Sequence, residues 1–506
     1  MPTTALPLRR ALHALPVAIA AAVFVPAVVG AGWVADDAVN LAMHAQEGDL
    51  LGEWTTPTYA HAGSGRGHIW RPVPATLQHL VALGVERSAV AFRLLNVTLH
   101  LGNVLLLQWL ARRRGASMTG AAVLALFFAD HPVVPDAVCW SSDVYDLAAT
   151  TAVLALLGIA LSALPLVHRA MGVAAFTLVA GLCKESAVAI VPVVGIASGM
   201  GRDGLRGGMI LLASSAAGAA AYLGWHGAIT AQSYAAAAGA TPLDEQLIAG
   251  LGAAGWLLPR WLGGAPMAHL FDPSDHLRPA AGALTLMAFL AGGAAMWKRR
   301  RRSAIALVVA GGAWAMLLAP AAVGIPLIGV QAVRYAYLPL AVCTLLAAHD
   351  AGPCSRRTPV ALAGAFAALG LVHTLPRTHA FAHDGTLWST ELAAEPENPY
   401  AAGSLARWLL KRGEHERALQ LWVGAVEAIP PGVRVFDRDR ERWLLAQAAF
   451  LRDRPDLAHQ QVQQYITSMQ AQERPVPGNA WCLQADSLDR LGRAAEAADA
   501  ATRCRP

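Results

Sequence analysis

Residues 11–34 read ALHALPVAIAAAVFVPAVVGAGWV, an apolar run that follows Arg9 and Arg10 and ends just before Asp36 and Asp37. A helix of about 20 apolar residues is long enough to cross the hydrocarbon core of a bilayer. A secretory signal peptide has a shorter apolar region, and further apolar runs follow in this chain. The stretch is therefore expected to be the first of several membrane helices, with two adjacent carboxylates at its end.

The composition of the whole chain also indicates a membrane protein. Of its 506 residues, 55% are hydrophobic and 14% are charged, whereas a soluble chain carries about a quarter charged residues. The net charge of +5 comes from short basic clusters between apolar runs, which is typical of loop anchors at a membrane surface. We therefore expect no nucleic-acid partner.

The apolar runs predict about eleven spans in an all-α, polytopic transmembrane helical bundle. They cover residues 11–34, 89–110, 116–130, 147–165, 170–183, 186–200, 207–228, 279–297, 303–320, 335–349 and 358–376. If the N-terminus is cytoplasmic, the basic clusters between spans all fall inside, as the positive-inside rule requires. The outer segments are then 35–88, 131–146, 229–278, 321–334 and everything after 377. This parity places a multi-pass protein in the inner (cell) membrane, with its C-terminal domain periplasmic.

One segment admits two topologies. Residues 170–200 form either two short spans or one long span. One long span would require 246–263 to cross the membrane and would put Arg202 and Arg206 outside. Two short spans keep more basic residues inside, so this arrangement is preferred, and 246–263 becomes a re-entrant or interfacial helix.

The sequence changes to charged amphipathic helices from residue 399. Residues 399–431 fit the tetratricopeptide pattern, with small or turn-forming residues at Ala406, Gly413, Ala418, Ala425 and Pro430. The spacing of Ala406 and Ala418 recurs in Ala446 and Ala458, then in Ala485 and Ala497. Gly492 takes the turn position of Gly413, while the second copy has Asp453 there.

The chain is thus expected to divide into a membrane domain over 1–376, a connecting segment over 377–398 and a TPR-like α-solenoid of three repeats over 399–506. Such arrays form concave surfaces that bind a protein partner. A purely structural cap on the membrane domain is the alternative.

The six cysteines form no CxxC pair and no zinc-ligand spacing. They are Cys139, Cys183, Cys343, Cys354, Cys482 and Cys504. Cys482 and Cys504 are the best candidates for a disulfide if the tail lies in an oxidising compartment. Unpaired thiols are the preferred interpretation.

The predicted outer loops gather ionisable side chains at the membrane boundary, where such groups are functional candidates. Besides Asp36 and Asp37 they are Arg71, Arg93, His131, Asp136, Asp143, Asp146, Lys184, Glu185 and Arg334. Two structural explanations compete with function: a single carboxylate can be a solvated helix end, and Lys184 can neutralise Glu185. Asn96, His100 and Asn103 share one face of the second span and are expected to form interhelical hydrogen bonds.

The order of these motifs resembles the GT-C glycosyltransferase superfamily, in the branch that joins a protein O-mannosyltransferase-like membrane domain to tetratricopeptide repeats. The matching pieces are Asp36-Asp37, Trp70-Arg71-Pro72, Asn96-Val97-Thr98-Leu99-His100, Phe127-Phe128-Ala129-Asp130-His131-Pro132, Asp136-Ala137-Val138 with Trp140, Asp146-Leu147-Ala148-Ala149, Lys184-Glu185 and Arg334-Tyr335-Ala336-Tyr337-Leu338-Pro339. The resemblance covers nearly the whole chain and rests on the order of the pieces. In two departures, Asp136 stands where the family usually has Glu, and residues 61–68 are rich in Gly and His.

The resemblance implies transfer of a hexose, mannose-like, from a polyprenyl-phosphate sugar to an exported protein, with inversion at the anomeric carbon. By position Asp36 matches the catalytic acidic residue, and Asp37 orients it or substitutes for it. The expected ligands of the donor phosphate are Arg71, Lys184 and Arg334, with Arg93 and His131 as further candidates. The expected acceptor and sugar pocket contains Asp136, Asp143, Glu185 and Tyr335.

The residue types suit this chemistry. A carboxylate can take the proton of the attacking hydroxyl as a general base, and fixed cations stabilise the charge that develops on a leaving phosphate. No cofactor or metal is required, although clustered carboxylates offer a divalent cation as an alternative.

Three other functions compete with protein glycosylation. The acceptor is alternatively an envelope glycolipid or polysaccharide, because a fold does not fix the acceptor. A non-enzymatic membrane scaffold, whose repeats gather envelope-assembly partners, is the alternative from another class. A transporter is disfavoured because the ionisable residues gather at one face.

Overall fold

The computed structural model is helical and contains no strand over the residues it describes. These are 5–35, 37, 50–57, 69–85, 88–199, 204–238, 278–297, 332–348, 370–429 and 438–504, with single positions or short pieces within 248–260, 311 and 361–368. Asp36, the Gly- and His-rich stretch 61–68, the expected span 303–320 and most of 246–263 and 358–369 lie outside this set. The chain splits into two compact units, here called the membrane unit (up to His383) and the tail unit (from Asp384).

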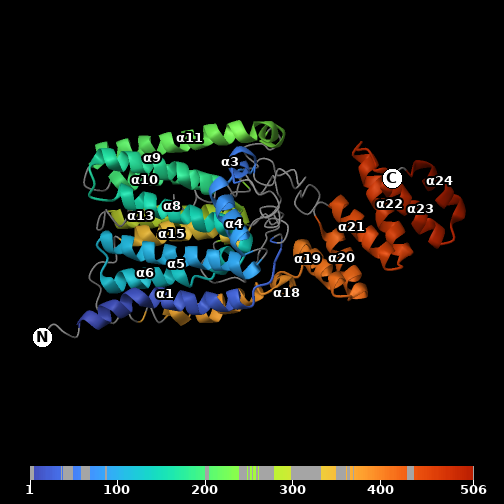
Figure 1. The fold of residues 1–506 in the computed structure, drawn as a ribbon, viewed down its shortest axis with the longest axis horizontal. Coiled ribbons are helices and arrows are strands. Elements are labelled where there is room, and N and C mark those ends of the chain that lie inside the picture. The colour runs from blue at the N-terminus through green and yellow to red at the C-terminus, as the bar shows by residue number, and fades with distance from the viewer. Residues whose placement is uncertain are drawn as a thin grey trace. The chain divides into compact units, whose positions relative to one another are not determined.

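Long apolar helices dominate the membrane unit and lie side by side (Figure 1). Five are long and apolar enough to cross a bilayer: α1 (Ala5–Val29), α5 (Ala89–Arg113), α8 (Val144–Ala160), α9 (Leu166–Cys183) and α11 (Gly204–Ala238). Shorter apolar helices accompany them: α6 (Met118–Ala129), α10 (Val191–Gly199), α13 (Arg278–Trp297) and α15 (Tyr337–Ala347). The chain is therefore a multi-pass membrane protein by length and composition, and five of the roughly eleven predicted spans meet the criterion within the described ranges.

Local sequence signals set the limits of α5. Ser88 caps its start, since its side chain accepts a hydrogen bond from the amide of Ala91. Arg112 and Arg113 occupy the last turn, where positive charge is favourable next to the unsatisfied carbonyls of a helix end. Arg112 also donates to the carbonyl of Ala116, which ties the turn into α6.

The polar face of α5 holds the neighbouring helices in place. Asn96 donates to the carbonyl of Trp140 over 2.7 Å, and Asn103 donates to that of Leu147 over 3.0 Å. The ring nitrogen Nδ1 of His100 lies 2.8 Å from the hydroxyl of Tyr337. The prediction of interhelical hydrogen bonds is confirmed for His100 and Asn103, whereas Asn96 bonds Trp140, which lies between helices.

The chain reverses direction at Lys184. α9 ends at Cys183, Lys184 is extended (φ −160°, ψ 127°), and a 3₁₀ turn, η3 (Glu185–Ile190), leads into α10. α11 runs alongside α9, with Ser215 2.9 Å from Thr177 and Tyr222 against Gly181, where a Cβ would lie 2.5 Å from the ring.

α11 also packs on α10, where Gly208 contacts Gly199 and Leu212 contacts Gly195. Residue numbers therefore rise along α11 as they fall along α10. α10 is therefore antiparallel to α11 and α9, so residues 170–200 form two separate elements. Lys184 and Glu185 lie at the tip of the hairpin between them.

Three successive helix pairs build the tail unit after a first helix, α18 (Asp384–Ala394). They are α19 (Pro399–Lys411) with α20 (His415–Ala428), α21 (Arg438–Leu451) with α22 (Pro455–Ala471), and α23 (Gly478–Arg490) with α24 (Ala494–Arg503). The alanines that repeat in the sequence are buried in each pair: Ala406 and Ala418, Ala446 and Ala458, Ala485 and Ala497. Small side chains at these positions let the two helices of a pair approach closely.

Each pair turns through a residue with positive φ. The angles are 85° at Gly413, 58° at Asp453 and 73° at Gly492. In each turn the next amide donates to a carbonyl five residues back, for example Arg454 to Ala449 over 3.0 Å. This is the left-handed helix ending that usually requires glycine and that aspartate tolerates.

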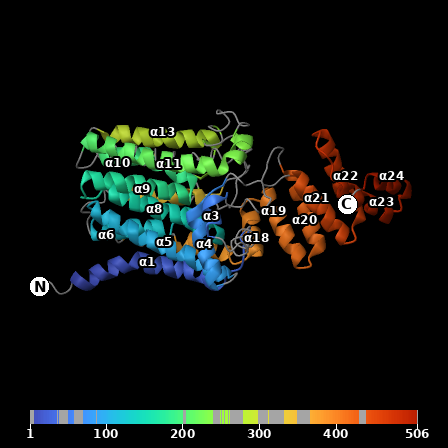
Figure 2. The ribbon, with the colours of Figure 1, turned by 45° about the horizontal axis from the view of Figure 1, so that its top comes forward.

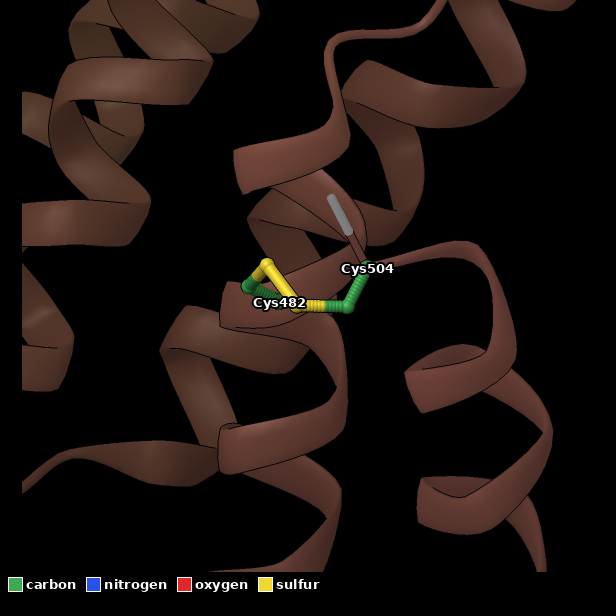
Figure 3. The surroundings of a disulfide bond; sticks show 2 residues. All are labelled: Cys482 and Cys504. Carbon is green, nitrogen blue, oxygen red and sulfur yellow. A yellow bond between two sulfur atoms is a disulfide. The ribbon is translucent and has the colours of Figure 1, made fainter. Parts of the chain in front are cut away.

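A disulfide closes the last pair. Cys482 on α23 is bonded to Cys504, which follows α24, with 4.6 Å between their Cα atoms (Figure 3). The preference for unpaired thiols is thus wrong for these two residues, because the helix pairing brings the ends of a 22-residue stretch together. Cys139, Cys183 and Cys343 are buried in the membrane unit, and Cys354 lies outside the described residues.

Replacing Cys482 with Ser is expected to destabilise α23 and α24 by about 3 kcal/mol, because the bond restricts the unfolded state of that loop. Hydrogen exchange of the full chain measures this as lost protection of the two helices. The wild type under reducing conditions serves as the matched control and should lose the same protection. Equal protection in the oxidised wild type and the variant would contradict the prediction.

Candidate active site

The carboxylate of Asp37 is buried and held by three hydrogen bonds. It follows the end of α1, and its Oδ2 accepts from the amide of Val34 over 3.3 Å. The amide and hydroxyl of Ser142 donate to its Oδ1 over 2.8 and 2.7 Å. Ser142 belongs to the 3₁₀ turn η2 (Ser141–Asp143), which precedes α8. Asp37 is therefore fixed beside the acidic start of α8, and its neighbour Asp36 lies outside the described residues.

Two carboxyl groups at the start of α8 each face a cation. The Nε of Arg334 lies 3.4 Å from Oδ1 of Asp143, and Nζ of Lys184 donates to Oδ1 of Asp146. Burial of several charges is tolerable when each is paired and hydrogen-bonded.

A third ion pair is more open. Both oxygens of Glu185 accept from the guanidinium of Arg71, with 2.8 Å between Nε and Oε2. Arg71 comes directly before α4 (Pro72–Val85). The Glu185 side chain is 41% exposed, whereas the carboxylates of Asp143 and Asp146 are buried. Of the three pairs, this one is the most accessible.

An aromatic ring supports each of the three cations. The guanidinium carbon of Arg334 lies 3.7 Å from the ring centroid of Trp140, and that of Arg71 lies 4.8 Å from that of Tyr145. Nζ of Lys184 lies 4.7 Å from the ring centroid of Tyr335. Cations over aromatic faces are attracted to the ring quadrupole, more strongly where water is excluded.

These contacts bring most of the predicted site residues together. We call the group the charged cluster and define it as Asp37, Arg71, Asp143, Asp146, Lys184, Glu185, Arg334 and Tyr335. It is assembled from five separate parts of the chain: the end of α1, the start of α4, the start of α8, the hairpin tip after α9, and the 3₁₀ turn η4 (Val333–Ala336) before α15.

Two other predicted phosphate ligands are engaged elsewhere. Arg93 is fully buried and donates to the carbonyls of Ala27, Gly32 and Phe381 over 2.9 to 3.0 Å. It thereby ties the end of α1 to the segment after α17 (Leu375–Ala380), which is a structural role. His131 is buried, accepts weakly from the amide of Val133, and packs edge-on to Phe127.

Asp136, which we expected in the acceptor pocket, forms a buried pair with Arg377. The guanidinium donates to both carboxylate oxygens, over 3.1 and 2.8 Å, and both side chains are almost completely buried. Arg377 was not among the predicted site residues. Its signal was a single arginine directly after the last apolar run, at the first position of the predicted connecting segment.

Asp130 is a further acidic residue that the site prediction did not include. It caps the C-terminus of α6 and is buried, and among the described residues neither carboxylate oxygen has a hydrogen-bond partner. Gly370 packs directly on it, since a Cβ there would lie 2.6 Å from the Cβ of Asp130. Thr374 fixes the backbone by donating to the Asp130 carbonyl over 2.6 Å.

The chemistry available to the charged cluster follows from this geometry. A fixed carboxylate, Asp37, is bonded through Ser142 to the turn that carries Asp143. The three cations of the cluster pair with Asp143, Asp146 and Glu185 and lie against aromatic rings. Such a site can bind an anionic group and stabilise negative charge as it develops. Among the described residues, no group of three or more His, Cys, Asp and Glu side chains is arranged to hold a metal ion.

No protein-family model, no curated protein and no solved structure matches this chain.

Proposed function

We propose that this chain is a GT-C-like membrane glycosyltransferase that moves a mannose-like hexose from a polyprenyl phosphate to an exported protein. One observation carries the proposal. Arg71, Lys184 and Arg334, which are far apart in the sequence, lie with Asp37 in one cluster at one end of a bundle of membrane-length helices. The phosphate of a polyprenyl-phosphate donor lies at the membrane surface, where membrane-length helices end.

The proposed reaction is a single displacement. The acceptor oxygen bonds to the anomeric carbon on the face opposite the phosphate. The bond from that carbon to the phosphate oxygen breaks, and its electron pair stays on the departing polyprenyl phosphate. The hydroxyl proton passes to a carboxylate of the Asp36-Asp37 pair, in which Asp37 orients Asp36 or takes its place.

The cations bind the phosphate by exchanging partners. Each now contacts a carboxylate, so the phosphate must take the place of Glu185, Asp143 or Asp146 as it enters. The pair of Arg71 and Glu185 is the most accessible, which makes it the entry point. The rings of Trp140, Tyr145 and Tyr335 keep the cations in place during the exchange, because their contacts with the cations do not involve the carboxylates. The displaced carboxylates then face the sugar and acceptor hydroxyls.

The same proposal places the charged cluster and the tail unit on the outer side of the inner membrane. The bond between Cys482 and Cys504 supports this placement for the tail, because structural disulfides persist in oxidising compartments. The three helix pairs resemble a tetratricopeptide array in their buried alanines and left-handed turns. We infer that they bind the polypeptide acceptor.

The proposal is tested first in cells and then with the purified protein. Mass spectrometry of exported glycoproteins and glycolipids, with and without the protein, identifies the acceptor class. The purified chain in nanodiscs with a polyprenyl-phosphate hexose then measures transfer. Arg334→Gln is expected to lower kcat/KM about 10²-fold, since one preorganised cationic contact to the leaving group is lost.

Arg113→Gln is the matched control, because Arg113 is an exposed arginine at the last residue of α5, against the ring of Trp109 and outside the charged cluster, and it should leave transfer unchanged. Loss of glycolipids with intact glycoproteins would move the proposal to an envelope acceptor. An unchanged glycan profile in cells lacking the protein, with a changed set of envelope complexes, would replace the enzyme with a scaffold.

A further inference from the structure

A short uncharged helix crosses the end of the membrane unit that carries the charged cluster. α4 follows Arg71 and packs on α5, α8 and α9. Both views show it steeply inclined to those helices (Figures 1 and 2). Its sequence, PVPATLQHLVALGV, contains no Asp, Glu, Lys or Arg. It therefore lies across the bundle end and not along it.

The helix has one buried and one exposed apolar face. Pro74, Ala75, Gln78, His79 and Ala82 face the bundle and are buried. The outward face, which we define as Leu80 and Leu83, one turn apart, is exposed, with 64% of Leu83 accessible. A contiguous apolar face of this kind on a helix marks a surface that another apolar phase covers.

The outward face continues surfaces that face lipid. α5 begins four residues after Val85, packs on α4, and exposes Val90 and Leu94. Beyond the other end of α4, Trp225 of the membrane-length helix α11 is exposed and lies 6.0 Å, between ring centroids, from Trp54. Tryptophan is enriched where a membrane helix meets the headgroup layer. The helix thus lies at the depth at which the bundle leaves the acyl chains.

We propose that the outward face of α4 is seated in the bilayer, with the boundary between headgroups and acyl chains as its occupant. Helices that are too short to span the membrane and carry an apolar face occur in the plane of the interface, with that face toward the acyl chains. This placement holds Arg71, at the start of α4, at the depth of the lipid phosphates. The inference does not depend on the transferase proposal, although it gives a phosphate on a lipid a direct route to Arg71.

Quenching of a fluorescent label, by nitroxides at a known depth in the bilayer and by iodide in water, tests the inference. Leu83→Cys, in a Cys354→Ser background, is labelled with an environment-sensitive fluorophore on the full chain in nanodiscs. Cys139, Cys183 and Cys343 are buried, and Cys482 is bonded to Cys504. Lipids that carry a nitroxide high on the acyl chain should remove most of the fluorescence, and aqueous iodide should remove little.

Leu451→Cys is the matched control, because Leu451 is an exposed leucine on the tail helix α21 (74% accessible). Its label should respond to iodide and not to the nitroxide lipids. Leu80→Cys repeats the test if the first variant folds poorly. Iodide quenching at position 83 equal to that at 451 would overturn the inference. Protection from both quenchers that grows with protein concentration would also overturn it, in favour of a second copy of this chain.

Discussion

Replacing Asp36 and Asp37 together with Asn is expected to lower hexose transfer about 10³-fold, within the range that a general base contributes. The new amide oxygen at position 37 would still accept from the amide and hydroxyl of Ser142. The turn should therefore keep its shape and the chain should still be inserted. Proton abstraction is lost, because a neutral amide is not a base. Single-turnover transfer in nanodiscs measures the rate, and the single variants show which carboxylate carries it.

Ser142→Ala is the matched control for the positioning of Asp37. It removes one hydrogen bond to Asp37 and leaves both carboxylates, so a loss of about fivefold is expected for about 1 kcal/mol. A double Asn variant that transfers sugar at the wild-type rate would exclude Asp36 and Asp37 as the base. If it also kept the wild-type partners and phenotype, the scaffold function would be favoured.

Arg377→Met is expected to cost about 3–5 kcal/mol of stability, because it leaves the buried carboxylate of Asp136 without its partner. Arg377 joins α17 to the short helix α7 (Val134–Val138) through both carboxylate oxygens. A methionine fills similar volume, so the loss reports charge and not packing. Equilibrium unfolding of the membrane unit in detergent gives the free energy.

The double variant Arg377→Met with Asp136→Asn completes the cycle. It removes both charges and is expected to recover most of the loss, since replacing a whole buried pair is often nearly neutral. Losses that simply add would show that the two residues act independently. A loss below about 1 kcal/mol for Arg377→Met would show that water reaches the pair, as at surface ion pairs.

The predictions that the structure supports came from patterns among residues close together in the sequence. The twelve-residue spacing of Ala406 and Ala418 predicted burial, because the register of two helices joined by a tight turn depends on nearby residues. The polar face of α5 was predictable in the same way, since helical periodicity alone places Asn96, His100 and Asn103 together.

Pairings across long sequence distances could not be predicted. Arg93 looks in the sequence like any boundary cation, and its burial against three carbonyls depends on how α1 and α17 pack around it. The partner of Asp136 lies 241 residues away, and many arginines could have served. The disulfide likewise depended on a distance between helix ends and on the redox state of a compartment, and the cysteine spacing encodes neither.

The hairpin tip at Lys184 makes the length of α9 as important as its composition. A helix advances about 100° per residue, so one residue inserted between Thr177 and Lys184 would turn Lys184 away from Asp146 and toward the surrounding helices. Thr177 anchors the register by its bond to Ser215, and the turn at Lys184 follows α9 without a loop that could absorb the change. Insertions and deletions should therefore be tolerated poorly in this hairpin, even where single substitutions are harmless.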